Sequence, residues 1–304
     1  MADLSESSKS GEKLIAVVGP GAIGTTIAAA LHEVGRTPML CGRSAREHLE
    51  LRHGDDLVTV PGPVLTDPWQ IEKGVDLVFL AVKATQVDAA APWLSALCRP
   101  DTVVCVLQNG VEQETAVAPH VPDSPVVPAV VWFPAQPQPD GSVWLRGDAR
   151  LTLPDVGPAQ VVQEVLRASH CTVELATDFT TVAWRKLLQN AVAGLMVLAG
   201  RRAGMFARED IAGLALDYAR ECLAVARAEG ADLGDEVPLE IIGAFQGFPA
   251  DMGTSILTDR EARRPLEWDI RNGVIVRLGR KHGIPTPVSD VVVPLLAAAS
   301  DGPG

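Results

Sequence analysis

A glycine-rich turn between an apolar strand and an Ala-rich helix constrains this chain more than any other feature. The residues from Leu14 to Val18 form an apolar, β-branched run of strand length. The run ends at Gly19-Pro20-Gly21, where small residues allow a tight turn, and an apolar segment follows from Ala22 to Val34. The order strand, Gly-x-Gly-x-x-Gly, helix predicts an α/β fold with a Rossmann-type, doubly wound and mostly parallel sheet.

The residues of this motif have expected roles in binding a dinucleotide. Gly19 makes the turn, Gly21 lets a pyrophosphate approach the backbone, and Gly24 lets helix and strand pack closely. The pyrophosphate would lie at the positive end of the helix dipole, among free backbone N–H groups. A βα turn that binds no ligand is the alternative. We predict a cofactor-binding segment consisting of Gly19, Pro20, Gly21, Ala22, Ile23 and Gly24.

The end of the second expected strand, Thr37 to Cys41, indicates which cofactor is bound. Chains that bind NAD commonly place an acidic residue about 20 positions after the glycines, where it holds the ribose 2′-OH. Here Cys41 is followed by Gly42, Arg43 and Ser44, without an acid. Arg43 can pair with a 2′-phosphate, so NADP(H) is favoured; a solvated surface arginine is the alternative.

Polar residues follow two further apolar runs, Val75 to Val82 and Thr102 to Leu107. Such runs are typical of parallel strands that are buried on both faces. Lys83 follows the first run and Asn109 follows the second. Because open α/β sheets bind ligands at the carboxyl ends of their strands, we expect both residues at one edge. A simple Asn-Gly turn is the alternative for Asn109.

Further along the chain, strand patterns give way to helical ones near Ala176. Val126 to Phe133 is expected to be a strand, whereas Asp178 is a plausible N-cap of a long helix. Lys186 and Asn190 are four residues apart in that helix, on one face. We predict a disordered tail (1–11), an NADP-binding Rossmann domain (12–176), a helical substrate and catalytic domain (177–299) and a mobile tail (300–304).

A late helix is expected to begin at Pro265, which fits the first turn of a helix, and to end at His282-Gly283. Glu267 would then lie in the first turn of that helix, where the helix dipole favours acidic side chains. A purely helical role is therefore the alternative to a functional role for Glu267.

The composition limits which classes of binding partner and which cellular compartment we expect. The formal net charge of −12 argues against nucleic acid and anionic membranes as partners. Five cysteines and six histidines show no disulfide or metal spacing, so we expect a reduced, cytoplasmic protein without a metal. No apolar run reaches the roughly 18 residues of a membrane span.

Taken in order, several motifs resemble those of the ketopantoate reductases (2-dehydropantoate 2-reductases). They are Gly-Pro-Gly-Ala-Ile-Gly at 19–24, Lys-Ala-Thr-Gln at 83–86, Gln-Asn-Gly-Val at 108–111, Trp-Arg-Lys-Leu-Leu-Gln-Asn at 184–190, Ser-Ile-Leu-Thr-Asp at 255–259 and Glu-Trp-Asp at 267–269. The resemblance implies NADPH-dependent reduction of a 2-oxoacid, ketopantoate, to pantoate, on the way to pantothenate and coenzyme A.

The same resemblance implies residue roles. Lys186 would be the catalytic proton donor, and Asn190 and Ser255 would hold the substrate. Asn109 would lie beside the nicotinamide end of the cofactor, within reach of the substrate. The remaining cofactor-side residues would be Arg43, Lys83, Ala135 and Glu267.

The chain also departs from the family pattern, which leaves three functions open. Members carry substrate-binding asparagines eight residues after the lysine and ten further on, where this chain has Gly194 and Gly204. The first function is ketopantoate reduction. The second is a related reductase or β-hydroxyacid dehydrogenase for another oxoacid, which the two glycines favour. The third is a non-catalytic NADPH-binding sensor, and any of the three could be a homodimer.

Overall fold

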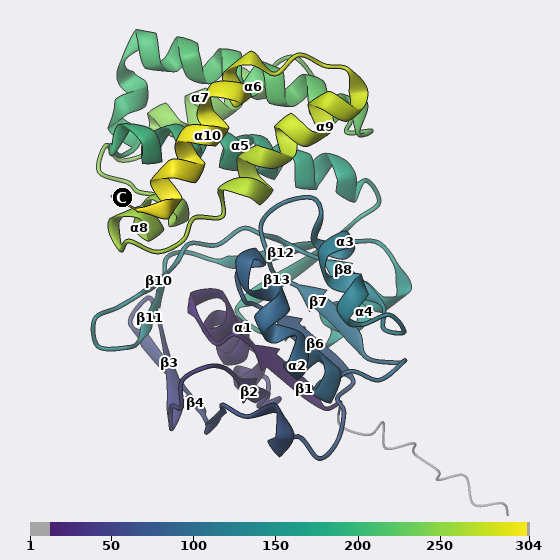
Figure 1. Cartoon of the computed structure of the whole chain (residues 1–304). Helices are drawn as coiled ribbons and strands as arrows, with labels where there is room; N and C mark the ends of the chain where they lie inside the picture. Colours follow the sequence, from purple (N-terminus) through teal and green to yellow (C-terminus); the bar gives the residue numbers. More distant parts are fainter. Residues whose placement is uncertain (1–12, 303–304) are drawn as a thin grey trace, which may run out of the picture.

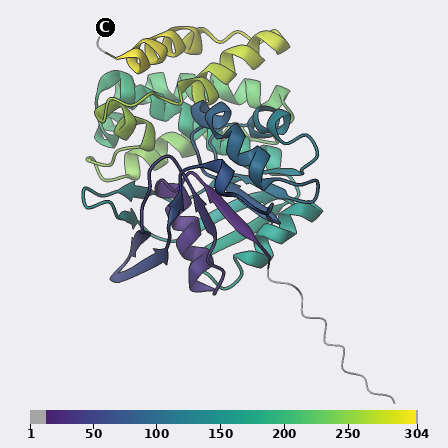
Figure 2. The ribbon, with the colours of Figure 1, turned by 60° about the horizontal axis from the view of Figure 1, so that its bottom comes forward.

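The computed structural model describes residues 13–302, so the expected disordered tail at 1–11 lies outside the described residues. Figure 1 shows two halves: the strands and the helices up to residue 165 form one, and the helices from residue 179 onward form the other. Turned by 60°, the C-terminal helices remain the part farthest from the first strand (Figure 2).

The main sheet has six strands in the order β5-β2-β1-β6-β7-β8, and every neighbouring pair is parallel. Its members are β1 (Ile15–Val18), β2 (Met39–Cys41), β5 (Val64–Leu65), β6 (Leu77–Leu80), β7 (Val103–Val106) and β8 (Val126–Pro128). The strand order changes direction at β1, as in dinucleotide-binding folds. The predicted doubly wound parallel sheet is therefore confirmed.

Alternate residues of the central strands enter two separate cores. Val17 and Phe79 belong to a cluster on the face covered by α1 (Ala22–Glu33), whereas Val18 and Leu80 belong to a cluster with α2 (Val87–Leu97). Because successive side chains of a strand point to opposite faces, a sheet covered on both sides needs unbroken apolar strands. This burial is the physical reason that the apolar runs in the sequence identified the strands.

Two smaller sheets flank the main one. One has the order β10-β11-β3-β4 and the other β13-β12-β9. Their strands are β3 (His48–His53), β4 (Asp56–Pro61), β9 (Val130–Val131), β10 (Ala135–Pro137), β11 (Val143–Leu145), β12 (Ala149–Pro154) and β13 (Cys171–Ala176). The short helices of this half are α3 (Gln113–Val117), α4 (Gly157–Val165), η1 (Pro68–Gln70), η2 (Ala84–Gln86) and η3 (Ala118–His120).

The expectation of one strand from Val126 to Phe133 is wrong. Strand β8 ends at Pro128 and pairs with β7, while β9 pairs with β12 in another sheet. The Ala129 N–H still donates to the Val106 carbonyl of β7 at 3.0 Å, and the chain changes sheets directly after it, at Val130.

The second half consists of helices around a core of its own, which is made of residues between Trp184 and Leu296. Asp178 caps α5 as expected, since its Oδ1 accepts a hydrogen bond from the Thr181 N–H at 3.0 Å. The helices are α5 (Phe179–Ala199), η4 (Ala203–Ala207), α6 (Glu209–Ala228), α7 (Val237–Gly247), α8 (Ser255–Glu261), the π-helical turn η5 (Asp269–Gly273), α9 (Val274–His282) and α10 (Pro287–Asp301). The division into two domains at residue 176 stays a prediction.

One expectation about this half is wrong. No helix begins at Pro265: residues 264–267 are irregular, and the helical conformation begins at Trp268 and continues through η5 into α9. The tail expected to be mobile from residue 300 is helical up to Asp301, and residues 303–304 lie outside the described residues, so its mobility stays a prediction. The Ser300 Oγ accepts a hydrogen bond from the Leu266 N–H at 2.9 Å, which ties the irregular segment to α10.

Candidate active site

The glycine motif connects β1 to α1, and its three glycines differ in the space around them. A Cβ on Gly24 would lie 2.3 Å from the Gly19 carbonyl oxygen, and a Cβ on Gly19 would lie 2.7 Å from the Val82 side chain. A Cβ on Gly21, at the N-cap of α1, would have no neighbour within 4 Å. Open space at a helix N-terminus suits an anionic group such as a pyrophosphate. The motif therefore fits a dinucleotide.

Arg43 lies beside this motif. The Gly19 N–H donates to the Cys41 carbonyl at 2.9 Å, so the end of β2 lies against the glycine turn. Arg43 follows two residues later and is exposed. This is a position from which a guanidinium can reach a phosphate on the ribose, although its role in cofactor binding stays a prediction.

Lys186 faces a cavity between the two halves. The cavity is lined by residues after β7, by β9 and by one face of α5, and among them are Asn109, Lys186 and Asn190. The Lys186 Nζ lies 4.9 Å from the centre of the Trp132 ring. Burial, and then the positive charges of Arg271 and Arg150, lower the pKa of Lys186 to about 8. Lys186 can therefore hold a proton at neutral pH and release it readily.

A chain of hydrogen bonds connects the lysine helix to Glu267. The Asn190 Nδ2 donates to the Asn109 Oδ1 at 3.2 Å, and the Asn109 Nδ2 donates to the Glu267 Oε2 at 3.4 Å. The Ala84 N–H donates to the Glu267 Oε1 at 3.1 Å. Because a carboxylate only accepts, Glu267 orients the Asn109 amide, which leaves its oxygen towards Asn190.

The sequence did not identify Arg271 or Trp132. Arg271 is 2% exposed and lies in η5; its Nη2 is 3.1 Å from the Ser255 Oγ and 3.4 Å from the Glu267 Oε2. The spacing of four between Glu267 and Arg271 was the available signal. Trp132 gave no local signal, because its contact with Lys186 depends on the tertiary structure.

Lys83 is occupied by a partner from the helical half. Its ammonium pairs with Asp259 on α8, and the second oxygen of Asp259 is 3.0 Å from the Arg264 Nε. Asp259 is 7% exposed. The strand end that carries Lys83 is thereby joined to α8, while Ala135, in β10, pairs with Leu145 and does not line the cavity.

The two glycines at expected asparagine positions also lie away from the cavity. A Cβ on Gly194 would lie 2.9 Å from the Asn272 amide and 3.0 Å from Leu296, inside the helical core. A Cβ on Gly204 would lie 2.9 Å from the Ala250 Cβ. Neither glycine is among the residues that line the cavity, and both contact the helical half.

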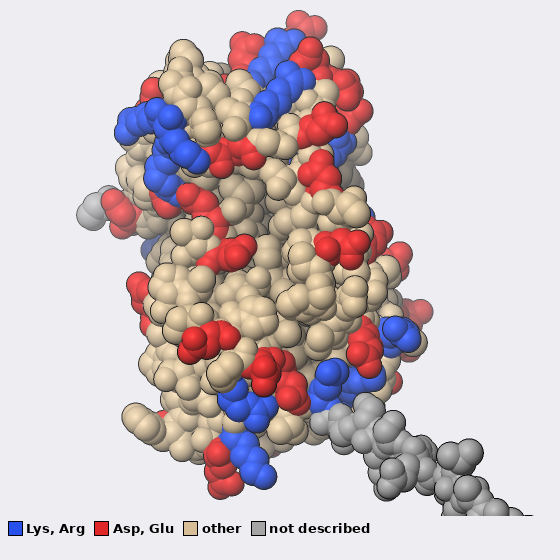
Figure 3. All heavy atoms as spheres, turned by 90° about the vertical axis from the view of Figure 1, so that its right-hand side faces the viewer, with Lys and Arg blue, Asp and Glu red and all other residues tan. Residues whose placement is uncertain are grey.

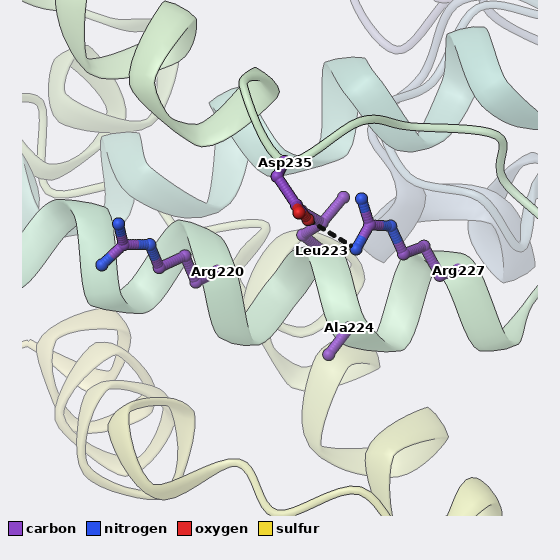
Figure 4. Close-up of a pocket in the computed structure, with 5 residues that line it drawn as sticks. All are labelled: Arg220, Leu223, Ala224, Arg227 and Asp235. Atoms are coloured by element: carbon purple, nitrogen blue, oxygen red, sulfur yellow. Dashed lines mark ion pairs between the residues drawn. The ribbon is translucent and has the colours of Figure 1, made fainter.

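A larger hollow lies on the outer face of α6, between Arg220, Arg227 and Asp235 (Figure 4). Arg227 pairs with Asp235 at 2.8 Å, and Arg220 points away from that pair. The charges there are largely neutralised, and the residues assigned to catalysis are elsewhere. The cavity at Lys186 is therefore the candidate active site.

The surface and the remaining residues add little to the site. Figure 3 shows one face on which Lys and Arg gather towards the two ends, with scattered Asp and Glu between them. Within residues 13–302, no three His, Cys, Asp or Glu side chains cluster as metal ligands would. No helix in that range has the length and apolar character needed to cross a membrane.

Comparisons with known proteins agree along the whole chain. Residues 15–158 match the family model for ketopantoate reductase PanE/ApbA, and residues 178–300 match the model for its C-terminal part. The chain is 59% identical over 291 residues to a 2-dehydropantoate 2-reductase of Mycobacterium tuberculosis, which covers 95% of this chain and 99% of the relative. It is 38% identical over 289 residues to a 2-dehydropantoate 2-reductase of Caulobacter vibrioides, which covers 94% and 99%.

A solved structure of a ketopantoate reductase has a similar fold. The dimeric ketopantoate reductase from Staphylococcus aureus is similar with a TM-score of 0.87 and 27% identity, and the match covers 95% of this chain and 99% of that one. The α/β half and the helical half are thus both present in that relative.

The glycine geometry predicts opposite effects for two alanine substitutions. In Gly24→Ala the new methyl meets a backbone carbonyl, so we expect a loss of roughly 1–3 kcal/mol in the free energy of unfolding. In Gly21→Ala the methyl meets open space, so stability should fall by less than about 1 kcal/mol, but NADPH binding should weaken at least about tenfold. Chemical denaturation and fluorescence titration with NADPH measure the two effects. Unchanged NADPH affinity in Gly21→Ala would contradict the assignment of the motif.

Proposed function

We propose that this chain reduces 2-dehydropantoate to pantoate with NADPH. The chain belongs to the ketopantoate reductase family and is therefore an NADP-dependent oxidoreductase. This reaction would place it in pantothenate and coenzyme A biosynthesis, in the cytoplasm. The observation that carries the proposal is the position of Lys186, which shares one cavity with Asn109 and Asn190.

Lys186 is the proposed proton donor. When a ketone accepts a hydride, negative charge develops on its oxygen, and a nearby ammonium can both stabilise that charge and donate a proton. With a pKa of about 8, Lys186 is protonated at neutral pH, and its proton is easier to transfer than that of a solvated lysine. The Trp132 ring, 4.9 Å from Nζ, favours the charged form and holds it at the cavity.

The remaining roles follow from the hydrogen bonds. NADPH, when bound, supplies the hydride. The residues that would hold it are the glycine motif, Arg43 and Lys83. Lys83 can donate to a second partner besides Asp259, because an ammonium has three N–H donors. Glu267 fixes Asn109 between the cofactor side and Asn190. Asn190 and Ser255 would bind the oxoacid.

The direct test is NADPH oxidation by the purified protein with a panel of branched 2-oxoacids. Turnover of 2-dehydropantoate well above the others supports the proposal. Faster turnover of another oxoacid would assign the second function, and NADPH binding without turnover of any acid would assign the sensor function.

Lys186→Ala tests the proton donor. Loss of a general acid typically costs about 10²–10⁴-fold in rate, and we expect the upper part of that range because Lys186 also stabilises charge. The loss should affect kcat and kcat/KM together and leave NADPH affinity nearly unchanged. In steady-state kinetics, near-native turnover at neutral pH would assign the proton to water or another group. As a comparison, Asn190→Ala should mainly raise KM for the oxoacid.

The pH profile of the wild-type enzyme gives an independent check of Lys186. A general acid works only while it is protonated, so kcat/KM should fall as the pH rises through about 8, the pKa of Lys186. In Lys186→Ala the residual activity should lack this basic limb.

Arg43→Ala tests cofactor choice. The guanidinium can form charge-assisted hydrogen bonds with the 2′-phosphate, which NADH lacks. NADPH affinity should therefore fall by roughly 10- to 100-fold, while NADH affinity changes little. Equal losses for both cofactors would show that another group, rather than Arg43, binds the phosphate.

We also propose a homodimer. The support is the dimeric relative, together with the outer face of α10, where Val291 and Leu295 are exposed. Light scattering should give twice the mass of the chain, and a monomer at working concentrations would contradict the proposal.

A further inference from the structure

Arg271 is a buried cation with too few partners for its charge. It is 2% exposed, and both of its hydrogen bonds use the same nitrogen, Nη2. Its buried Nε has no hydrogen-bond partner. A buried charge is costly unless it is paired and hydrogen-bonded, so an incompletely paired arginine indicates a function that compensates for the cost.

The local backbone is unusual at the same position. Arg271 lies in the π-helical turn η5, which joins Trp268 to α9. Short π-helical segments within helices occur frequently at functional sites. This backbone observation is independent of the charge argument.

The carboxylate nearest to Arg271 is shared with other donors. The Glu267 Oε2 lies 3.4 Å from the Arg271 Nη2 and also accepts from Asn109, while Oε1 accepts from the Ala84 N–H. The hydrogen bond from Arg271 to Glu267 is therefore long, and the carboxylate that accepts it is shared with two other donors. Much of the positive charge of Arg271 remains available for another anion.

Ser255 connects this charge to the solvent. Its Oγ accepts a hydrogen bond from Arg271 at 3.1 Å, although Ser255 itself is exposed at the start of α8. A hydroxyl has one hydrogen to donate. With a lone pair of Oγ directed at Arg271, that hydrogen is free to point outward, towards a bound anion.

The other cations around the site already have carboxylate partners. Arg150 pairs with Glu174 at 2.7 Å, and Lys83 pairs with Asp259. Lys186 is needed at the carbonyl oxygen of the substrate. Of these side chains, Arg271 is the one whose charge is left for the carboxylate of a 2-oxoacid.

We propose that Arg271 is a positioning residue for the substrate carboxylate: it holds the Ser255 hydroxyl as a donor and places a positive charge directly behind it. The inference rests on the proposed function, because it assumes that the substrate is a 2-oxoacid. The matching ligand class is a small carboxylate with an adjacent oxygen.

The first test measures binding rather than turnover. The NADP⁺-loaded enzyme is titrated with pantoate by isothermal calorimetry, for wild type, Arg271→Met and Arg271→Lys. A hydrogen bond with a charged partner predicts a rise in Kd of roughly 10- to 100-fold for Arg271→Met. Arg271→Lys keeps the charge and should restore part of the affinity. Equal Kd values for wild type and Arg271→Met would overturn the inference.

The matched control is Arg280→Met. Arg280 lies in α9, nine residues after Arg271, and its side chain is 78% exposed. Arg280→Met removes a positive charge from the same region of the chain as Arg271→Met, but we expect its affinity for pantoate to remain that of the wild type. A loss as large as in Arg271→Met would indicate a general effect of net charge and would also overturn the inference.

The pH profile separates a charge effect from a structural one. The charged groups that act on Lys186 are Arg271, from η5, and Arg150, from β12, while the Trp132 ring contacts its ammonium. Removing Arg271 removes a repulsive charge, so the pKa of Lys186 should rise and the basic limb of kcat/KM should move to higher pH. Arg271→Lys should leave the limb in place. An unmoved limb in Arg271→Met would show that Arg271 acts only as packing.

Ser255→Ala keeps the proposal testable if Arg271→Met does not fold. It removes an exposed hydroxyl, so folding should be preserved, and the pantoate Kd should rise by at least about threefold, since the hydrogen bond from this hydroxyl to the carboxylate is lost. Unchanged affinity in Ser255→Ala would contradict the inference. The two proposals fail in different ways. A wild type that does not reduce 2-dehydropantoate would contradict the proposed function, whereas variants that bind pantoate as tightly as the wild type would contradict the role of Arg271.

Discussion

The carboxylate of Glu267 is the interaction on which the geometry of this site depends. It is 7% exposed and belongs to the helical half, yet it accepts from Ala84 and Asn109 at the edge of the main sheet. A buried carboxylate is stable only with such partners, so the two halves must meet in one arrangement to satisfy it. That arrangement places Asn109 against Asn190 and sets the cavity in front of Lys186.

Charge is distributed unevenly in this protein. The chain has a formal net charge of −12, but the groups around Lys186 include Arg150 and Arg271. Burial and these like charges favour the neutral amine, whereas the Trp132 ring favours the ammonium. Since an anion is otherwise repelled by an acidic protein, local cations are required to attract an oxoacid and a phosphorylated cofactor. These cations add to burial, which is the larger cause of the lowered pKa of Lys186.

The sequence predicted those parts of the fold that local physics determines. The strands of the main sheet are buried on both faces, so their apolar runs were visible, and Asp178 was recognisable as a helix cap. Contacts that depend on distant segments were missed: the change of sheets after Pro128, the hydrogen bond from Leu266 to Ser300, and the stacking of Lys186 on Trp132. In the candidate site, residue types and spacing singled out Lys186 and Asn190, which line one cavity, and their roles stay a prediction. Nothing local indicated the burial of Arg271.

The geometry of α5 places the residues that follow Lys186 on different sides of the helix. Successive helical residues are rotated by about 100°, so a residue eight positions after Lys186 lies about 80° around the helix from it. Asn190 lines the cavity, but Gly194 faces the helical core, where a Cβ would lie 2.9 Å from the Asn272 amide and 3.0 Å from Leu296. With glycine at this position, α5 presents no side chain there. Ser255 and Arg271, which we propose for the substrate carboxylate, lie on two other elements, α8 and η5, and are joined by a hydrogen bond of 3.1 Å.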